Sequence, residues 1–155
     1  AKKIGLQIEG EFAEEPDNPG LVLGLIGTLP VETIDEFQES LTTTLGYPVK
    51  VLKKHDHVNK VAIVTGGGFI PSLIQEAINL GCDTYITGII TGNAGEYSVN
   101  SYPKTKAKVD LLPINVIGAS HYLTEKWAPQ FSVPYFEQFA PSSFVEDESA
   151  LTKLE

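Results

Sequence analysis

The chain has 155 residues and a mass of 16.8 kDa, which suits one compact domain and is too short for two of ordinary size. Its 42% hydrophobic and 20% charged residues exclude disorder as the main state. The net charge of −9, with lysine as every one of the 11 cations, argues against binding nucleic acid through a basic face or an arginine clamp.

Several further classes are excluded by what the sequence lacks. The single cysteine, Cys82, excludes an internal disulfide and a cysteine-rich zinc site, and it fits a reducing compartment. No apolar run approaches the ~18 residues of a membrane span, and the first residues do not form a signal-peptide core. We therefore expect a cytoplasmic protein. Because the chain begins at Ala1 without methionine, either a start residue was removed or the chain is a piece of something longer.

The first third of the chain predicts a strand, a linker, a strand and a helix. Residues 1–20 contain a short alternating apolar strand and then an acidic stretch, 11–20, that is typical of a linker. Residues 21–30 predict a buried strand, and apolar residues at helical spacing predict a helix over 34–45. Thr33 and Glu36 have the spacing of a capping box at its start. We place the domain itself at residues 21–155, after the linker.

The rest of the chain alternates strands with helices. Residues 49–54, 60–66, 83–88 and 111–118 predict strands, and 55–60 a polar bridge. Helices are expected after Pro71 and after Ser120, while no structure is predicted for 101–108. Residues 143–155 suggest an edge strand followed by an acidic tail. This order predicts an α/β fold, a layered sandwich around a mixed, largely parallel sheet.

The turn at Gly66, Gly67 and Gly68 lies between a strand and a helix, where exposed amides can bind an anion. However, no Gly-Lys-Ser/Thr follows, and the dinucleotide fingerprint is incomplete because Pro71 ends it. A tight turn that needs positive φ is the favoured interpretation, and nucleotide binding is the weaker one.

The segment His55-Asp56-His57 has the residue types of a metal site. On a strand, the two histidines would share a face, but one pair does not fill a coordination sphere. Lys53 and Lys54 beside them disfavour a cation, so a solvated turn between two strands is favoured.

His121 and Glu125 are the third candidate, in the segment Gly118–Glu125 at the carboxyl end of a predicted strand, where open α/β sheets bind ligands. Four residues apart on the helix after Ser120, both side chains would project from one face. An imidazole and a carboxylate at that spacing can hold a divalent cation. The alternative is a surface pair on a capped helix.

The order and spacing of KVAIVTGGGF, DTYITG, INVIGASHYLTE and GLVLGLIGTLP resemble the Nif-three-like family, whose bacterial members carry the name GTP cyclohydrolase I type 2. The most specific part is the Gly-x-x-His-Tyr-x-Thr-Glu signature, matched by Gly118, His121, Tyr122, Thr124 and Glu125. The likeness extends from about Gly5 to the C-terminal segment.

The resemblance implies two similar α/β halves around a pair of divalent metals, zinc, manganese or iron, often in a hexameric ring. It implies that His121 and Glu125 are metal ligands from the second half. The His-His-Pro motif of the first half is missing, and Asp56 lies in no matching context. We therefore expect this chain to be the C-terminal portion of such a protein, and a homo-oligomer.

Two positions depart from the family pattern. Ile89 stands where a glutamate is usual, and Asn93 where a histidine is usual. Isoleucine neither binds a cation nor moves a proton, and asparagine is a poor substitute for imidazole. Two functions therefore remain open: part of a metal-dependent hydrolase for a nucleotide-like or phosphate-bearing substrate, with no catalytic residue assignable, or a non-catalytic interaction module that binds other protein chains.

Overall fold

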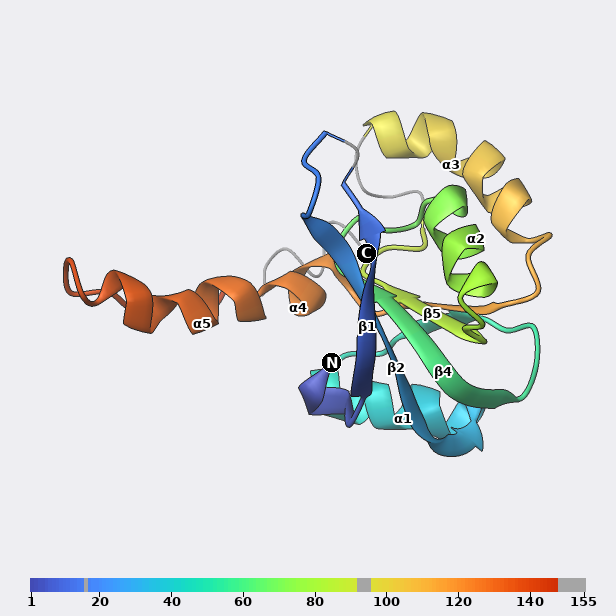
Figure 1. Ribbon diagram of the computed structural model, residues 1–155, viewed down its shortest axis with the longest axis horizontal. Helices are drawn as coiled ribbons and strands as arrows, with labels where there is room; N and C mark the ends of the chain where they lie inside the picture. Colours follow the sequence, from blue (N-terminus) through green and yellow to red (C-terminus); the bar gives the residue numbers. More distant parts are fainter. Residues whose placement is uncertain (16, 92–95, 148–155) are drawn as a thin grey trace.

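A single six-stranded mixed sheet forms the centre of the computed structural model, which describes residues 1–15, 17–91 and 96–147 (Figure 1). The strands lie in the order β1-β2-β4-β5-β6-β3. Their bounds are β1 Gln7–Glu14, β2 Val22–Thr33, β3 Lys50–Leu52, β4 His57–Val64, β5 Thr84–Thr87 and β6 Asn115–Gly118. The pairs β4–β5 and β5–β6 are parallel, and β1–β2, β2–β4 and β3–β6 are antiparallel. The predicted α/β class and mixed sheet are confirmed, although antiparallel pairs outnumber parallel ones.

Helices cover both faces of this sheet, with α1 on one face and α2 and α3 on the other (Figure 1). Their bounds are η1 Lys2–Ile4, α1 Ile34–Leu45, α2 Pro71–Asn79, α3 Glu96–Val109, α4 His121–Glu125 and α5 Trp127–Phe136. None of the helices in the described part of the chain is both long and apolar enough to span a membrane.

Alternation along the strands builds one apolar core on each face of the sheet, because successive side chains point to opposite sides. On β5, Tyr85 belongs to the core under α2 and α3, and Ile86 belongs to the core under α1. On β6, Val116 and Ile117 divide in the same way. All four residues of β5 are buried, as expected for a strand in the middle of a sheet covered on both faces.

The predicted capping box is confirmed. The Glu36 backbone N–H donates to the Thr33 hydroxyl at 3.2 Å, and the Thr33 N–H donates to the Glu36 carboxylate at 3.0 Å. The hydrogen bonds to Thr33 lower the pKa of Glu36. The helix then ends at Gly46 with a left-handed φ of 70°. Local sequence signals therefore located this helix correctly at both ends.

The acidic linker prediction is wrong for residues 11–14, because they continue β1 beside β2. Phe12 pairs with Gly24, and its ring is buried under α2 and α3. The polar bridge is also shorter than expected, since β4 begins at His57 and Val58 is fully buried. In both places the burial of a few apolar side chains stabilises a strand even though the neighbouring residues are polar.

Three other segments differ from their predictions, or have a structure where none was predicted. Residues 101–108, left unassigned, lie within α3. Residues 111–114 form a turn before β6. Residues 143–147, within the expected edge strand, have no regular secondary structure, and the rest of that prediction, 148–155, lies outside the described residues.

Candidate functional site at the carboxyl ends of three parallel strands

The three parallel strands deliver three short turns to one edge of the sheet. β4 leads to Gly66, β5 leads to Gly88, and β6 leads to Ser120 and α4. The carboxyl ends of parallel strands are where open α/β sheets place ligands. The sheet register therefore brings together residues that lie more than fifty positions apart in the sequence.

Backbone hydrogen bonds connect these turns to one another. The Gly66 carbonyl accepts from the N–H groups of Gly88, at 3.0 Å, and Ile89, at 3.2 Å. The Thr87 carbonyl accepts from the Ala119 N–H at 2.8 Å. The geometry of this edge thus depends on all three strands together.

His121 and Glu125 lie on one face of α4, as the sequence predicts. Nε2 of His121 is 3.0 Å from a carboxylate oxygen of Glu125, and their side chains are 38% and 51% exposed. Ser120 starts the helix, because its hydroxyl accepts from the Leu123 N–H at 3.2 Å. Ser120 is buried and holds a φ of 68° with ψ of 129°, a sparsely populated conformation for a residue with a Cβ. Strain of this kind is most often retained where a site requires it.

Gly66 packs its backbone directly against the histidine–glutamate pair. Its φ is 63°, and a Cβ atom there would lie 1.9 Å from Oε1 of Glu125 and 2.9 Å from Nε2 of His121. Its N–H donates to the Thr124 hydroxyl at 3.0 Å. The interpretation of the glycines as a tight turn is thereby supported at Gly66, whose N–H is occupied by Thr124 rather than open to an anion.

A cleft of about 530 Å³ lies beside the pair, with His121 in its wall. Its other described lining comes from the glycine turn, the start of α2, the residues after β5 and the helix α3: Gly67, Phe69, Ile70, Pro71, Ile89, Thr91, Ser101, Tyr102 and Thr105. The rings of Phe69 and Tyr102 are tilted by 31° with centroids 6.1 Å apart. Sequence reasoning missed both aromatic residues, and Tyr102 lies in the segment left unassigned.

His55 and Asp56 lie in the connection between β3 and β4, His57 begins β4, and the three side chains are not a converging set of donors. Lys53 lies 2.7 Å from the Asp56 carboxylate, and it lowers the pKa of that carboxyl by hydrogen bonding and charge. The two imidazole rings stack with centroids 4.1 Å apart, and Nδ1 of His55 lies 3.0 Å from the His57 carbonyl. The turn interpretation is supported. Within residues 1–15, 17–91 and 96–147, three or more potential metal-binding side chains do not converge at any point.

Cys82 is a buried, free thiol away from this edge. Burial raises its pKa to about 11, so the thiol stays protonated at neutral pH. Burial also raises the pKa of Tyr85, whose hydroxyl donates to the Gly68 carbonyl at 2.7 Å. Both groups act in packing, and Tyr85 additionally anchors the glycine turn.

The family model for Duf34/NIF3 (NGG1p interacting factor 3) matches residues 1–146 of the sequence. The chain belongs to the NIF3 family. None of the curated proteins gives a significant match.

Several solved structures share the fold of this chain. The protein ybgI, of unknown function, superposes with a TM-score of 0.65 at 21% identity, over 96% of this chain and 54% of its own. Reduced HcgD from Methanocaldococcus jannaschii gives a TM-score of 0.63 at 22% identity, over 91% of this chain and 50% of its own. A Bacillus cereus protein related to NIF3 gives 0.54 at 26% identity, over 79% and 31%. The chain spans about half the length, or less, of these relatives.

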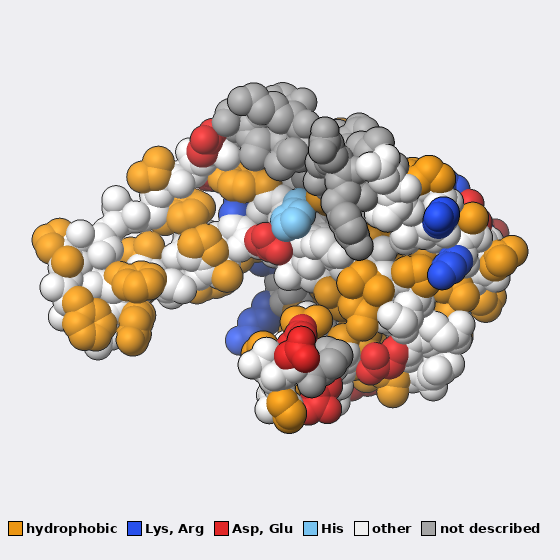
Figure 2. All heavy atoms as spheres, turned by 90° about the horizontal axis from the view of Figure 1, so that it is seen from above, with side chains coloured by type: hydrophobic (Ala, Val, Ile, Leu, Met, Phe, Trp, Pro, Cys, Tyr) orange, Lys and Arg blue, Asp and Glu red, His pale blue; other side chains and the backbone are white. Residues whose placement is uncertain are grey.

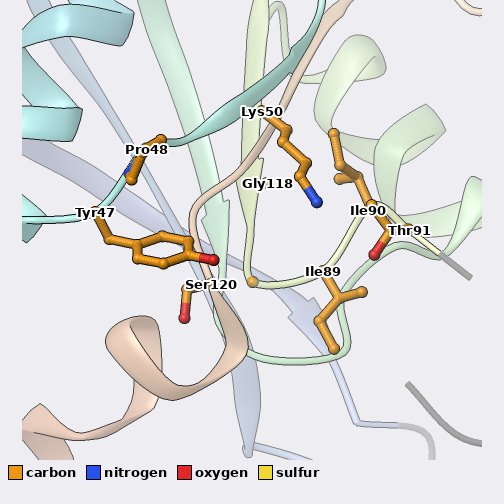
Figure 3. A pocket seen from close by; sticks show the side chains of 9 residues that line it. Tyr47, Pro48, Lys50, Ile89, Ile90, Thr91, Gly118 and Ser120 are labelled. Carbon is orange, nitrogen blue, oxygen red and sulfur yellow. The ribbon is translucent and has the colours of Figure 1, made fainter. Parts of the chain in front are cut away.

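Ile89, the first of the two positions expected to depart from the family pattern, is described by the structure. Ile89 is only 9% exposed and lies in the wall of both the large cleft and a smaller pocket of about 20 Å³. Figure 3 shows that smaller pocket, with Tyr47 and Lys50 entering from the connection after α1 and from β3. An apolar side chain therefore occupies this position in the walls of both cavities. Asn93, the second of these positions, lies outside the described residues.

Proposed function

We propose that this chain supplies two ligands, His121 and Glu125, to a divalent-cation site of zinc, manganese or iron. The observation that carries the proposal is their convergence to 3.0 Å against the Gly66 backbone, where three parallel strands end. Imidazole nitrogen and carboxylate oxygen are suitable donors for such cations. Because both side chains are partly exposed, there is room beside them for water or for metal ligands from another protein segment.

The two residues fit one side of a coordination sphere. Four donors are the usual number for zinc, so a tightly bound metal needs further donors beyond this pair. The relatives extend well beyond the part that this chain matches, and we propose that a complete, dinuclear centre draws on that additional part. When bound, divalent cations polarise substrate oxygen atoms and activate water, which is the chemistry of a hydrolase.

The cleft beside His121 supports a small-molecule substrate for this metal-dependent hydrolase. Its volume of about 530 Å³ lies in the range of ligand sites, and Phe69 and Tyr102 offer apolar rings to a flat group such as a nucleobase. We propose a nucleotide-like or phosphate-bearing substrate. Because the described lining contains no lysine, a phosphate group would be bound by the metal and by backbone N–H groups.

A zinc titration followed by histidine side-chain NMR tests the metal site, because the chain has 3 histidines. We expect zinc to shift the imidazole signals of His121 and to leave those of His55 and His57 unchanged. The variant His121→Ala should weaken zinc binding at least tenfold, whereas His57→Ala should match the native chain. Equal zinc affinity of His121→Ala and the native chain, or perturbation of His57 alone, contradicts the proposal.

The second candidate is an assembly module whose fold serves to join protein chains into a homo-oligomer. The observation that favours it is α5, on which no residue is buried although most of its residues are apolar or aromatic. Removal of a general base or metal ligand would leave such a function intact. Measurements of self-association therefore separate it from the metal function.

A further inference from the structure

Helix α5 extends away from the body of the molecule (Figure 1). Figure 2 shows it as an arm that carries hydrophobic side chains on its surface, separated from the body by a notch. Phe131, Tyr135 and Phe139 follow one another at intervals of four residues and are 76%, 59% and 72% exposed. That spacing places them along one face of the helix and its continuation. A monomer rarely leaves such a stripe in contact with water.

The aromatic stripe has an internal order that favours a contact surface. The ring of Tyr135 meets the ring of Phe139 edge to face, with centroids 5.4 Å apart, and meets Phe136 in the same way at 5.5 Å. Aromatic side chains with few rotatable bonds lose little entropy on binding and are enriched at interface centres.

An apolar groove of about 370 Å³ lies at the base of the same helix. Its floor comes from α1, the sheet and α4 and includes Leu45, Ile63, Ile86 and Leu123, and its wall includes Trp127 and Phe131. The stripe beyond Phe131 leads away from the groove, so the helix does not fold back to fill it. As far as the described residues show, one chain therefore carries both an unfilled groove and an unburied helix.

The distribution of charge favours the α5 segment of a second copy of this chain as the group that binds in the groove. Two copies with a net charge of −9 repel each other unless the contact lies where acids are scarce. Between Lys126 and Glu146, the sequence contains one charged residue, Glu137. The groove is bordered by Lys2 and Lys3, and Nζ of Lys3 lies 3.3 Å from the ring centroid of Trp127. Glu137 on one copy and these lysines on the other have complementary charges.

We propose that two copies of this chain associate through a two-fold axis, with the aromatic stripe of each α5 lying in the groove at the base of the other. In such a two-fold arrangement the same contact between α5 and the groove forms twice, so the helix and the groove of both copies are covered. The proposal deepens the assembly function and is independent of the metal site, because His121 and Glu125 do not line the groove. Variants at those two residues should leave the association unchanged.

Sedimentation equilibrium of the purified chain over a wide concentration range tests the dimer. We expect a monomer–dimer equilibrium that the double variant Tyr135→Ser/Phe139→Ser weakens at least tenfold, equivalent to about 1.4 kcal/mol. The matched control is Leu111→Ser, because Leu111 is 85% exposed in the turn before β6. The control should dimerise like the native chain. A chain that stays monomeric throughout, or an association equally strong in the double variant, overturns the proposal.

Disulfide trapping tests the reciprocal docking itself. A chain with Phe139→Cys is mixed with a chain with Lys2→Cys, while the buried Cys82 remains out of reach. We expect the mixed disulfide to dominate over both like-with-like disulfides on mild oxidation. Random proportions of the three products, or like-with-like products alone, contradict the arrangement. Circular dichroism of each variant shows that it is folded, and exposed positions such as these leave the monomer fold intact.

Discussion

Among the described residues, two clusters combine histidine with a carboxylate, and they differ in what surrounds them. His55 and Asp56 lie in the connection that leads to His57 at the start of β4, and Nδ1 of His55 and the Asp56 carboxylate are engaged by the His57 carbonyl and by Lys53. His121 and Glu125 lie where three strand ends converge, with a glycine backbone packed against them. The comparison teaches that two clusters of the same residue types can differ in their backbone surroundings, and only the second lies where distant backbone segments converge.

Hydrogen bonds with the buried side chain of Asn115 hold the first cluster in place. Oδ1 of Asn115 accepts from the N–H groups of Lys54, at 2.7 Å, and His55, at 3.1 Å. Its Nδ2 donates to the His57 carbonyl at 3.3 Å. The connection is therefore held by a polar residue of β6, and its histidines have a structural setting.

The largest expected effect is at the second cluster, from Gly88→Ala. A Cβ at Gly88 would lie 2.6 Å from the Gly66 carbonyl oxygen and 2.7 Å from Cα of His121, and these backbone atoms are held by hydrogen bonds. We expect a loss of about 3 kcal/mol or more in the free energy of unfolding, because backbone atoms cannot move aside as a side chain can. Urea denaturation monitored by circular dichroism measures it.

Gly67→Ala is the matched control, in the glycine turn after β4 whose Gly66 carbonyl accepts from the Gly88 N–H. No described atom lies within 4 Å of a Cβ built there, so the expected change is within about 0.5 kcal/mol. Similar losses for both variants would show that flexibility of the turn, rather than close approach to His121, accounts for the glycines.

The next effect is at the first cluster, from Asn115→Ala. Removal of the amide leaves the N–H groups of Lys54 and His55 without their side-chain acceptor, and we expect a loss of about 2 to 3 kcal/mol. Asn79→Ala, at an exposed asparagine on α2, should change stability by no more than about 0.5 kcal/mol. Zinc affinity of folded Asn115→Ala should equal that of the native chain. A weakened zinc affinity would place the metal near His55 instead.

Local signals predicted the elements whose stability is decided locally. Thr33 and Glu36 located the start of α1, and Pro71 located the start of α2. β1 was misjudged beyond residue 10 because the acids around Phe12 are those of an edge strand, and only pairing with β2 distinguishes it from a linker. Three-dimensional pairing carries information that composition does not.

The candidate site also combines features that local sequence predicts with features that depend on the three-dimensional packing. The spacing of His121 and Glu125 predicted a shared helix face, and the structure places them together. The approach of Gly66 and the cleft residues Phe69 and Tyr102 depend on the sheet register and on the packing of α3. The sequence alone does not distinguish a glycine that leaves room for a distant carboxylate from a glycine that only forms a turn.

The smallest expected effect, from Lys53→Ala, tests the comparison most sharply. Lys53 pairs with Asp35 at 3.1 Å and with Asp56 at 2.7 Å, but all three side chains are well exposed. We expect only a small fall in the free energy of unfolding, and a smaller one at high salt, because water and ions screen such pairs. If the lysine charge alone kept a cation away from His55 and His57, its removal would create zinc binding there. We expect none, because Nδ1 of His55 remains engaged in either tautomer, as a donor to the His57 carbonyl or as an acceptor from the Asn115 amide. Zinc-dependent shifts of the His57 signals in Lys53→Ala would show that charge, and not backbone convergence, separates the two clusters.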